Sequence, residues 1–108
     1  MTEEPRLRTI FEHFLALNHE AFATGHYSIA YYALAAALHT AQARQNVDGL
    51  ATVERIAGEQ LASIDRAAPE YEHSTQSAKA RGRTSIFTML AHQARTAFRI
   101  LQQQHGSP

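Results

Sequence analysis

Apolar residues recur every three or four positions along most of the chain, which is the spacing of an amphipathic helix. The first such stripe follows Pro5, which suits the first turn of a helix, and ends at Gly25, which suits a C-terminal cap. The pattern predicts four main helices, over residues 5–24, 27–45, 49–67 and 85–104. No stretch alternates between apolar and polar residues as a strand would. We therefore expect an all-α antiparallel helical bundle.

The second of these predicted helices has no polar side. Every residue from 29 to 38 is alanine, leucine, isoleucine or tyrosine. A helix that is apolar all round is either central in its fold or shared with a partner. We therefore expect the helix over residues 27–45 to contact two neighbours or a second copy of the chain.

Residues 69–84 offer little to bury. Pro69 ends the third helix, because the residue before a proline avoids the helical conformation. The polar residues that follow are compatible with either a linker or a short solvated helix. Gly82 then marks a new start before the last helix.

A glycine turn with small residues on both sides is typical of two closely packed helices. Gly25 and Tyr27 stand at such a turn, and Ala30 and Ala37 stand where the two helices would approach each other. Together with Phe14, Leu17 and Leu38, these residues make the segment 14–42 similar to one tetratricopeptide repeat. The resemblance implies a pair of antiparallel helices in the N-terminal half of the chain.

The resemblance also implies protein binding through the inner face of the first helix. The positions that match this face are Glu12, Leu15, His19, Phe22 and Ala23. The chain departs from the repeat pattern at three positions, with Asn18 in place of a small residue, Ala21 in place of an aromatic residue and Gln42 in place of a proline. No second copy follows at the 34-residue period of the family. An unrelated helical hairpin therefore remains the alternative reading.

The size and composition of the chain indicate one folded domain over residues 1–108. The 108 residues are 44% hydrophobic and 19% charged, which is incompatible with wholesale disorder. The absence of cysteine excludes a disulfide framework, a thiolate metal site and a cysteine nucleophile. The sequence contains neither a long apolar run nor a secretion-signal pattern, so we expect a cytoplasmic protein without membrane contact.

Acidic and basic residues are separated along the chain although they cancel in total. All ten acids lie in residues 1–72 with five arginines, whereas residues 73–108 contain five basic residues and no acid. These basic residues are Lys79, Arg81, Arg83, Arg95 and Arg99. They either neutralise acidic helices, within one molecule or across a dimer, or form a surface for an anion or a nucleic acid.

The sequence offers little for metal or nucleophilic chemistry. No two of the seven histidines stand three or four residues apart, and Glu70 and His73 form a single Glu-x-x-His motif where di-iron bundles need two. We therefore expect no metal and no cofactor. Arg99 and His105 have a spacing similar to the loose Arg/His motif of HEPN ribonucleases, in which histidine would move a proton and arginine would hold the phosphate.

The reading that these patterns favour is a non-enzymatic protein–protein interaction or assembly module that forms a homo-oligomer. The residues expected to contact the partner are Tyr31, Tyr32, His19 and Phe22. The alternative is a nucleic-acid-binding or regulatory protein that uses the five basic residues, and the third reading is the HEPN-like ribonuclease.

Overall fold

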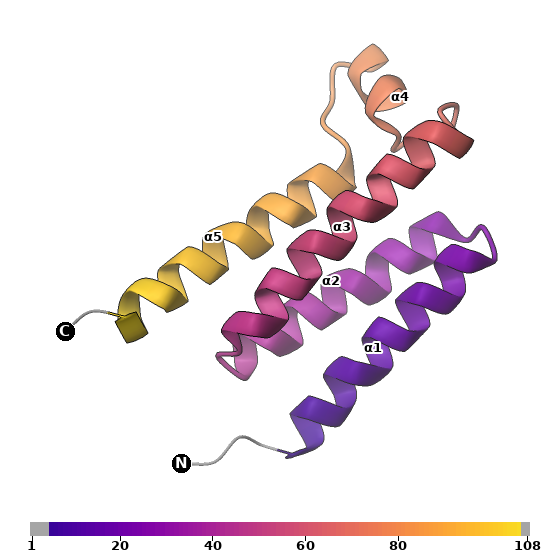
Figure 1. Cartoon of the computed structure of the whole chain (residues 1–108). Helices are drawn as coiled ribbons and strands as arrows, with labels where there is room; N and C mark the ends of the chain where they lie inside the picture. The colour runs from indigo at the N-terminus through magenta and orange to yellow at the C-terminus, as the bar shows by residue number, and fades with distance from the viewer. Residues whose placement is uncertain (1–4, 107–108) are drawn as a thin grey trace.

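The computed structural model describes residues 5–106, and side chains as far as residue 104. Within this part of the chain there are five helices and no strand (Figure 1). They are α1 (Pro5–Ala23), α2 (Tyr27–Ala43), α3 (Val47–Ala67), α4 (Thr75–Ala80) and α5 (Ile86–Gly106). The expected all-α bundle is confirmed, and the short α4 lies in the segment that the pattern left open between linker and helix.

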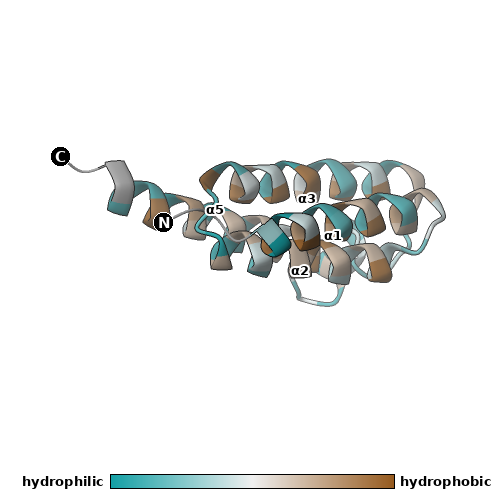
Figure 2. Ribbon diagram, turned by 90° about the horizontal axis from the view of Figure 1, so that it is seen from below, coloured by the Kyte–Doolittle hydropathy of each residue, from teal (hydrophilic) through white to brown (hydrophobic). Residues whose placement is uncertain are grey.

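The four long helices form a flattened bundle with extents of 47 × 28 × 16 Å. Figures 1 and 2 together place α2 and α3 on opposite sides of the thin dimension, with α1 beside α2 and α5 beside α3. The α2 side of the bundle also includes α1 and α5, because grooves lined by α1 and α2, and by α2 and α5, open there. The bundle therefore has two broad surfaces, one centred on α2 and one on α3.

Small residues on α2 allow its neighbours to approach closely. Ala30, Ala37 and Ala41 are completely buried, and Leu34 and Leu38 fill the spaces between them. The core continues through α3 and α5 with the buried side chains of Leu50, Val53, Ile64, Phe87 and Leu90. The inner side of α2 is thus the centre of the core.

Three of the connections between helices turn through a left-handed residue, and the first two, at Gly25 and Gln45, flank α2. Gly25 has φ +81°, and the N–H of His26 donates to the carbonyl of Ala21 at 2.8 Å. Gln45 has φ +53° at the end of α2, and the N–H of Asn46 donates to the carbonyl of Ala41 at 2.9 Å. These are Schellman-type endings, which satisfy carbonyl groups that the helix leaves open.

Helix α3 begins at Val47, two residues before the expected start at residue 49. The apolar pattern predicts Gly49 as the first residue of this helix, but Gly49 lies inside the helix and is buried. A Cβ atom at Gly49 would lie 3.2 Å from Cζ of Phe11 and 2.6 Å from Nδ2 of Asn46. The glycine therefore provides space for the ring from α1 rather than a break in the helix.

A pair of buried amides joins three helices. Asn18 of α1 is fully buried, and its Nδ2 donates to the carbonyl of Ala30 in α2 at 2.8 Å and to Oε1 of Gln60 in α3 at 3.0 Å. Nε2 of Gln60 donates back to Oδ1 of Asn18 at 2.7 Å. The residue that departs from the repeat pattern is thus a specific link between α1, α2 and α3.

The segment around α4 is held mainly by polar contacts. Asp65 accepts hydrogen bonds from the backbone N–H of Thr75 at 2.8 Å and from its hydroxyl at 2.7 Å. The hydroxyl of Ser74 caps α4 by accepting from the N–H of Ser77, and the hydroxyl of Ser85 donates to the carbonyl of His73 at 2.6 Å. These contacts order a segment that has few apolar side chains to bury.

We expect the Asn18–Gln60 pair to show strong coupling in a double-mutant cycle. Asn18→Leu should lower the free energy of unfolding by about 2–3 kcal/mol, because the Gln60 amide is left buried without its partner. The double variant Asn18→Leu, Gln60→Leu should lose less than the sum of the two single variants by about 1 kcal/mol or more. Urea unfolding measures these values, with the exposed Gln76→Leu as control. Strict additivity would contradict the pair's role.

The two glycines of α3 provide a matched test of its packing. At Gly58 a Cβ atom meets nothing within 4 Å, so Gly58→Ala should stabilise the protein by about 0.5–1 kcal/mol through helix propensity. Gly49→Ala should lack this gain, because the added methyl displaces Asn46 and presses on Phe11. Thermal unfolding of both variants checks the order. An equal gain at the two positions would mean that Gly49 is not a packing contact.

Candidate functional site

The large apolar side chains that remain exposed belong to three helices. Among the described residues they are Ile10, Leu17, Ile29, Tyr32, Met89 and Ile100. They lie on α1, α2 and α5, and none lies on α3. The outer side of α3 instead has an Arg55–Glu59 ion pair at 3.0 Å. Exposed apolar surface is therefore concentrated away from the α3 side of the bundle.

A groove between α1 and α2 has a volume of about 630 Å³. Its apolar lining comes from Phe14, Leu17 and Ala21 of α1 and from Ile29 and Ala33 of α2. Tyr32 also lines it and is 69% exposed. The groove thus combines an apolar hollow with a projecting aromatic side chain.

A second groove, of about 400 Å³, lies on the other side of α2, against α5. Its lining is more polar and includes His39 and Gln42 of α2 and His92 and Ile100 of α5. Helix α2 is therefore a ridge between two grooves. We call this surface, made by the exposed side of α2 and the two grooves beside it, the α2 face.

The two predicted contact tyrosines have different surroundings. The ring of Tyr31 is half-buried, 5.8 Å from the ring of Phe87 in α5 and 5.3 Å from the ring of Tyr32. Tyr32 remains exposed on the α2 face. Tyr31 thus packs α2 against α5, and Tyr32 is the member of the pair that is open to a partner.

The other two predicted contact residues are not part of the α2 face. His19 is exposed on α1, and Phe22 is half-buried, with its ring 5.1 Å from that of Tyr27. The ring of Tyr27 is in turn 5.3 Å from that of Tyr71, whose hydroxyl hydrogen-bonds the hydroxyl of Ser28 at 2.6 Å. The α1–α2 groove is lined by neither His19 nor Phe22.

The remaining positions implied by the repeat resemblance are divided between surface and core. Glu12 and Ala23 are exposed, whereas Leu15 is half-buried against the core. Sequence reasoning missed the surface roles of Leu17 and Ile29. Their position in the sequence indicates these roles, because both residues lie at the edge of an apolar stripe. A side chain there is covered only if a neighbouring helix reaches it.

The basic residues of the C-terminal third are partly neutralised within the molecule. Arg95 pairs with Glu54 of α3 at 3.4 Å, and Arg81 lies 3.8 Å from Glu72. Lys79, Arg83 and Arg99 are exposed, and none has an ion-pair partner among the described residues. One acid of α3 and one acid of the segment before α4 therefore pair with two of the five cations.

Residues 5–104 do not bring the candidate metal-binding or catalytic residues together into a site. This part of the chain contains no group of three histidine, aspartate or glutamate side chains placed to hold a metal ion. Arg99 is exposed, and the side chain of His105 lies outside the described residues. Nor does any described helix have the length and apolar character needed to cross a membrane.

Comparison with models of protein families, with curated proteins and with solved structures finds no match for this chain. The repeat resemblance therefore rests on the residues that carry it. The function has to be argued from the surfaces of the molecule itself.

We expect substitutions of Tyr31 and Tyr32 to have different effects on stability. Tyr31→Ala should lower the free energy of unfolding by about 2–3 kcal/mol, because it removes a ring packed between α2 and α5. Tyr32→Ala should cost less than about 1 kcal/mol, because its ring is largely in water. Urea unfolding at micromolar protein concentration measures both. The reverse order would contradict the assignment of Tyr31 to the core.

Proposed function

We propose that this chain is a non-enzymatic assembly module that pairs with a second copy of itself through the α2 face. The observation that carries the proposal is the exposure of Tyr32 and Ile29 beside an apolar groove. Exposed apolar surface of this kind on a small protein is typical of an interaction site. We place the module in the cytoplasm, as expected from its sequence.

The shape of the α2 face favours a second copy as the occupant. A twofold axis brings the same patch of both molecules together, so each copy must offer both a projection and a matching hollow. Tyr32 is the projection, and the groove lined by Leu17 and Ala21 is the hollow next to it. In a twofold pair the tyrosine of each copy would enter the groove of the other.

The charge of α2 also suits a symmetric contact. No residue from Tyr27 to Ala43 is aspartate, glutamate, lysine or arginine. Two copies therefore bring no like charges together at the centre of the contact, where interfaces are depleted of charged residues. The nearest acid in the groove lining is Glu20, on the side of α1.

The broad side of the bundle that includes the α2 face is large enough for a stable dimer. A standard interface buries about 800 Å² on each partner. The broad side of the bundle has extents of 47 × 28 Å, which accommodates such an area. A tyrosine that enters an apolar pocket near the middle of an interface is a common centre of binding energy, because ring and hydroxyl are both satisfied there.

The unpaired cations support the alternative, a nucleic-acid-binding or regulatory protein. Lys79, Arg83 and Arg99 are free of acidic partners among the described residues, as a phosphate-binding surface requires. We rank this reading second, because the chain as a whole carries no basic excess. Steep weakening of nucleic-acid binding with added salt would favour it.

Sedimentation equilibrium over a range of concentrations tests the dimer. We expect reversible dimer formation, weakened by about tenfold or more in Tyr32→Ala, because the residue removed fills the partner's groove. Leu17→Glu should act similarly by placing a charge in the hollow. Ala62→Glu, on the exposed side of α3, is the matched control and should leave association unchanged. A wild-type chain that stays monomeric at millimolar concentration would refute the proposal.

A further inference from the structure

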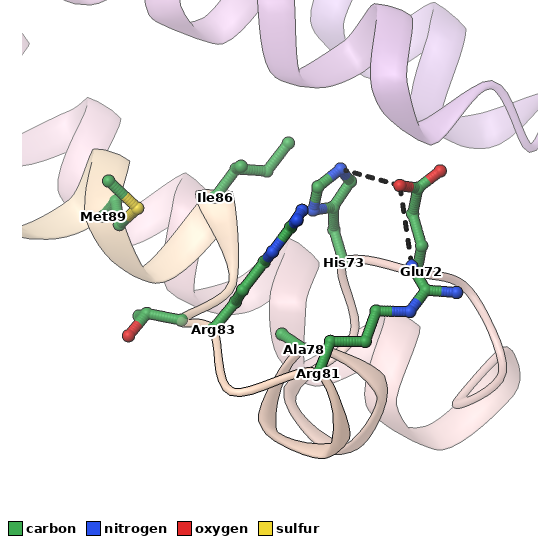
Figure 3. A pocket seen from close by; sticks show the side chains of 8 residues that line it. Glu72, His73, Ala78, Arg81, Arg83, Ile86 and Met89 are labelled. Atoms are coloured by element: carbon green, nitrogen blue, oxygen red, sulfur yellow. Dashed lines mark ion pairs between the residues drawn. The ribbon is translucent and has the colours of Figure 1, made fainter.

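A cleft of about 360 Å³ lies at the corner between α4 and α5 (Figure 3). Its polar side is formed by Arg81, Arg83, His73 and Glu72, and its apolar side by Ile86 and Met89. The cleft is separate from the grooves of the α2 face, which share no lining residue with it.

The polar side has more hydrogen-bond donors than acceptors. Oε2 of Glu72 lies 3.6 Å from Nε2 of His73 and 3.8 Å from Nη1 of Arg81 (Figure 3). Both distances exceed that of a hydrogen bond, and Arg83 has no acid within ion-pair distance among the described residues. Each guanidinium carries five N–H donors, so a single carboxylate leaves most of them without an acidic acceptor in the cleft.

The backbone that carries the two arginines is fixed by the end of α4. Gly82 has φ +69°, and its N–H donates to the carbonyl of Lys79 at 3.0 Å. The N–H of Arg83 donates to the carbonyl of Ala78 at 2.8 Å, which completes a Schellman ending around the buried Ala78. Both arginine side chains therefore extend from a backbone turn that is held by hydrogen bonds.

The backbone of His73 in the cleft is fixed as well. The hydroxyl of Ser85 donates to the carbonyl of His73 at 2.6 Å and accepts from the N–H of Phe87 at 3.2 Å. The ring of His73 lies 5.6 Å from that of Tyr71, and its side chain is 25% exposed. These contacts hold the histidine next to the start of α5.

We infer that this cleft binds a small organic phosphate, with the phosphate group between Arg81, Arg83 and His73 and an apolar group against Ile86 and Met89. Phosphate has enough oxygen atoms to accept from several donors at once, and guanidinium groups match it by shape and charge. On binding, the phosphate replaces Glu72 as the anion between Arg81 and His73. The ligand's apolar group covers Met89, which is 54% exposed.

A nucleic acid fits this corner less well than a small ligand. Of the five cations in residues 73–108, only Arg81 and Arg83 line the cleft, and Arg95 is engaged by Glu54 of α3. A polynucleotide backbone needs a continuous basic stripe, whereas one phosphate group needs only a local cluster of donors.

Calorimetric titration with phenyl phosphate at about 50 mM salt tests the inference, and inorganic phosphate is the comparison. We expect one site for phenyl phosphate and binding several-fold weaker for inorganic phosphate, which lacks the apolar group. Arg83→Ala and Arg81→Ala should each weaken binding about tenfold through lost charge-assisted hydrogen bonds. Glu72→Gln should strengthen binding, because the competing carboxylate is removed.

Arg99→Ala is the matched control. It also removes a cation from the C-terminal third of the chain, but Arg99 does not line the cleft. An equal loss in Arg99→Ala and Arg83→Ala, or no loss in Arg83→Ala, would overturn the inference. A single-stranded oligonucleotide could instead bind more tightly than phenyl phosphate and be weakened equally by Arg83→Ala and Arg99→Ala. That result would mean that these arginines bind nucleic acid. Binding only to vesicles that contain phosphatidic acid, with no affinity for phenyl phosphate, would overturn it in favour of a lipid surface. Unchanged thermal unfolding of each variant confirms that its fold is intact.

Discussion

Asn18 and Gln60 exchange two side-chain hydrogen bonds in the interior of the bundle, where both residues are buried. A third bond from Asn18 to the carbonyl of Ala30 brings α2 into the same network. A buried amide without a partner costs about 1–3 kcal/mol, so shifting any of the three helices by one turn would break at least one of these bonds at a cost of this order. An apolar core alone tolerates such shifts more easily. The pair therefore sets how α1, α2 and α3 lie along one another.

The exposed surface follows from that alignment. Leu17 adjoins Asn18 in α1, and Ile29 adjoins Ala30 in α2, so the bonded residues place their neighbours at the edge of the same groove. On the inner side of α2 the alanines allow close packing, and the larger side chains of Ile29 and Tyr32 remain outside. The interaction that closes the core thus also determines which apolar residues stay uncovered on the α2 face.

The bundle separates apolar from charged surface. The α2 face is centred on a helix without charged residues, whereas the cleft between α4 and α5 gathers two arginines around a single carboxylate. The two regions share no lining residue, so self-assembly and anion binding are compatible in one molecule. The acidic and basic residues that are separated along the sequence meet in part in the folded chain. Arg95 and Arg81 are engaged by acids of the N-terminal part, and the other three cations remain available.

Local patterns were sufficient for the elements of this protein but not for their contacts. Apolar periodicity identifies α1, α2, α3 and α5, and Gly25 identifies the first turn, because both depend on the chain's own backbone and on residues a few positions apart. The link from Asn18 to Gln60 spans 42 positions, and Gly49 reads as a break until the ring of Phe11 is seen against it. The hydrogen bonds from Asp65 to Thr75 likewise order a segment with almost no apolar signal. Tyr31 and Tyr32 are identical as residue types, and only the position of Phe87 in α5 makes one a core residue and leaves the other exposed, since burial depends on which helix packs nearby.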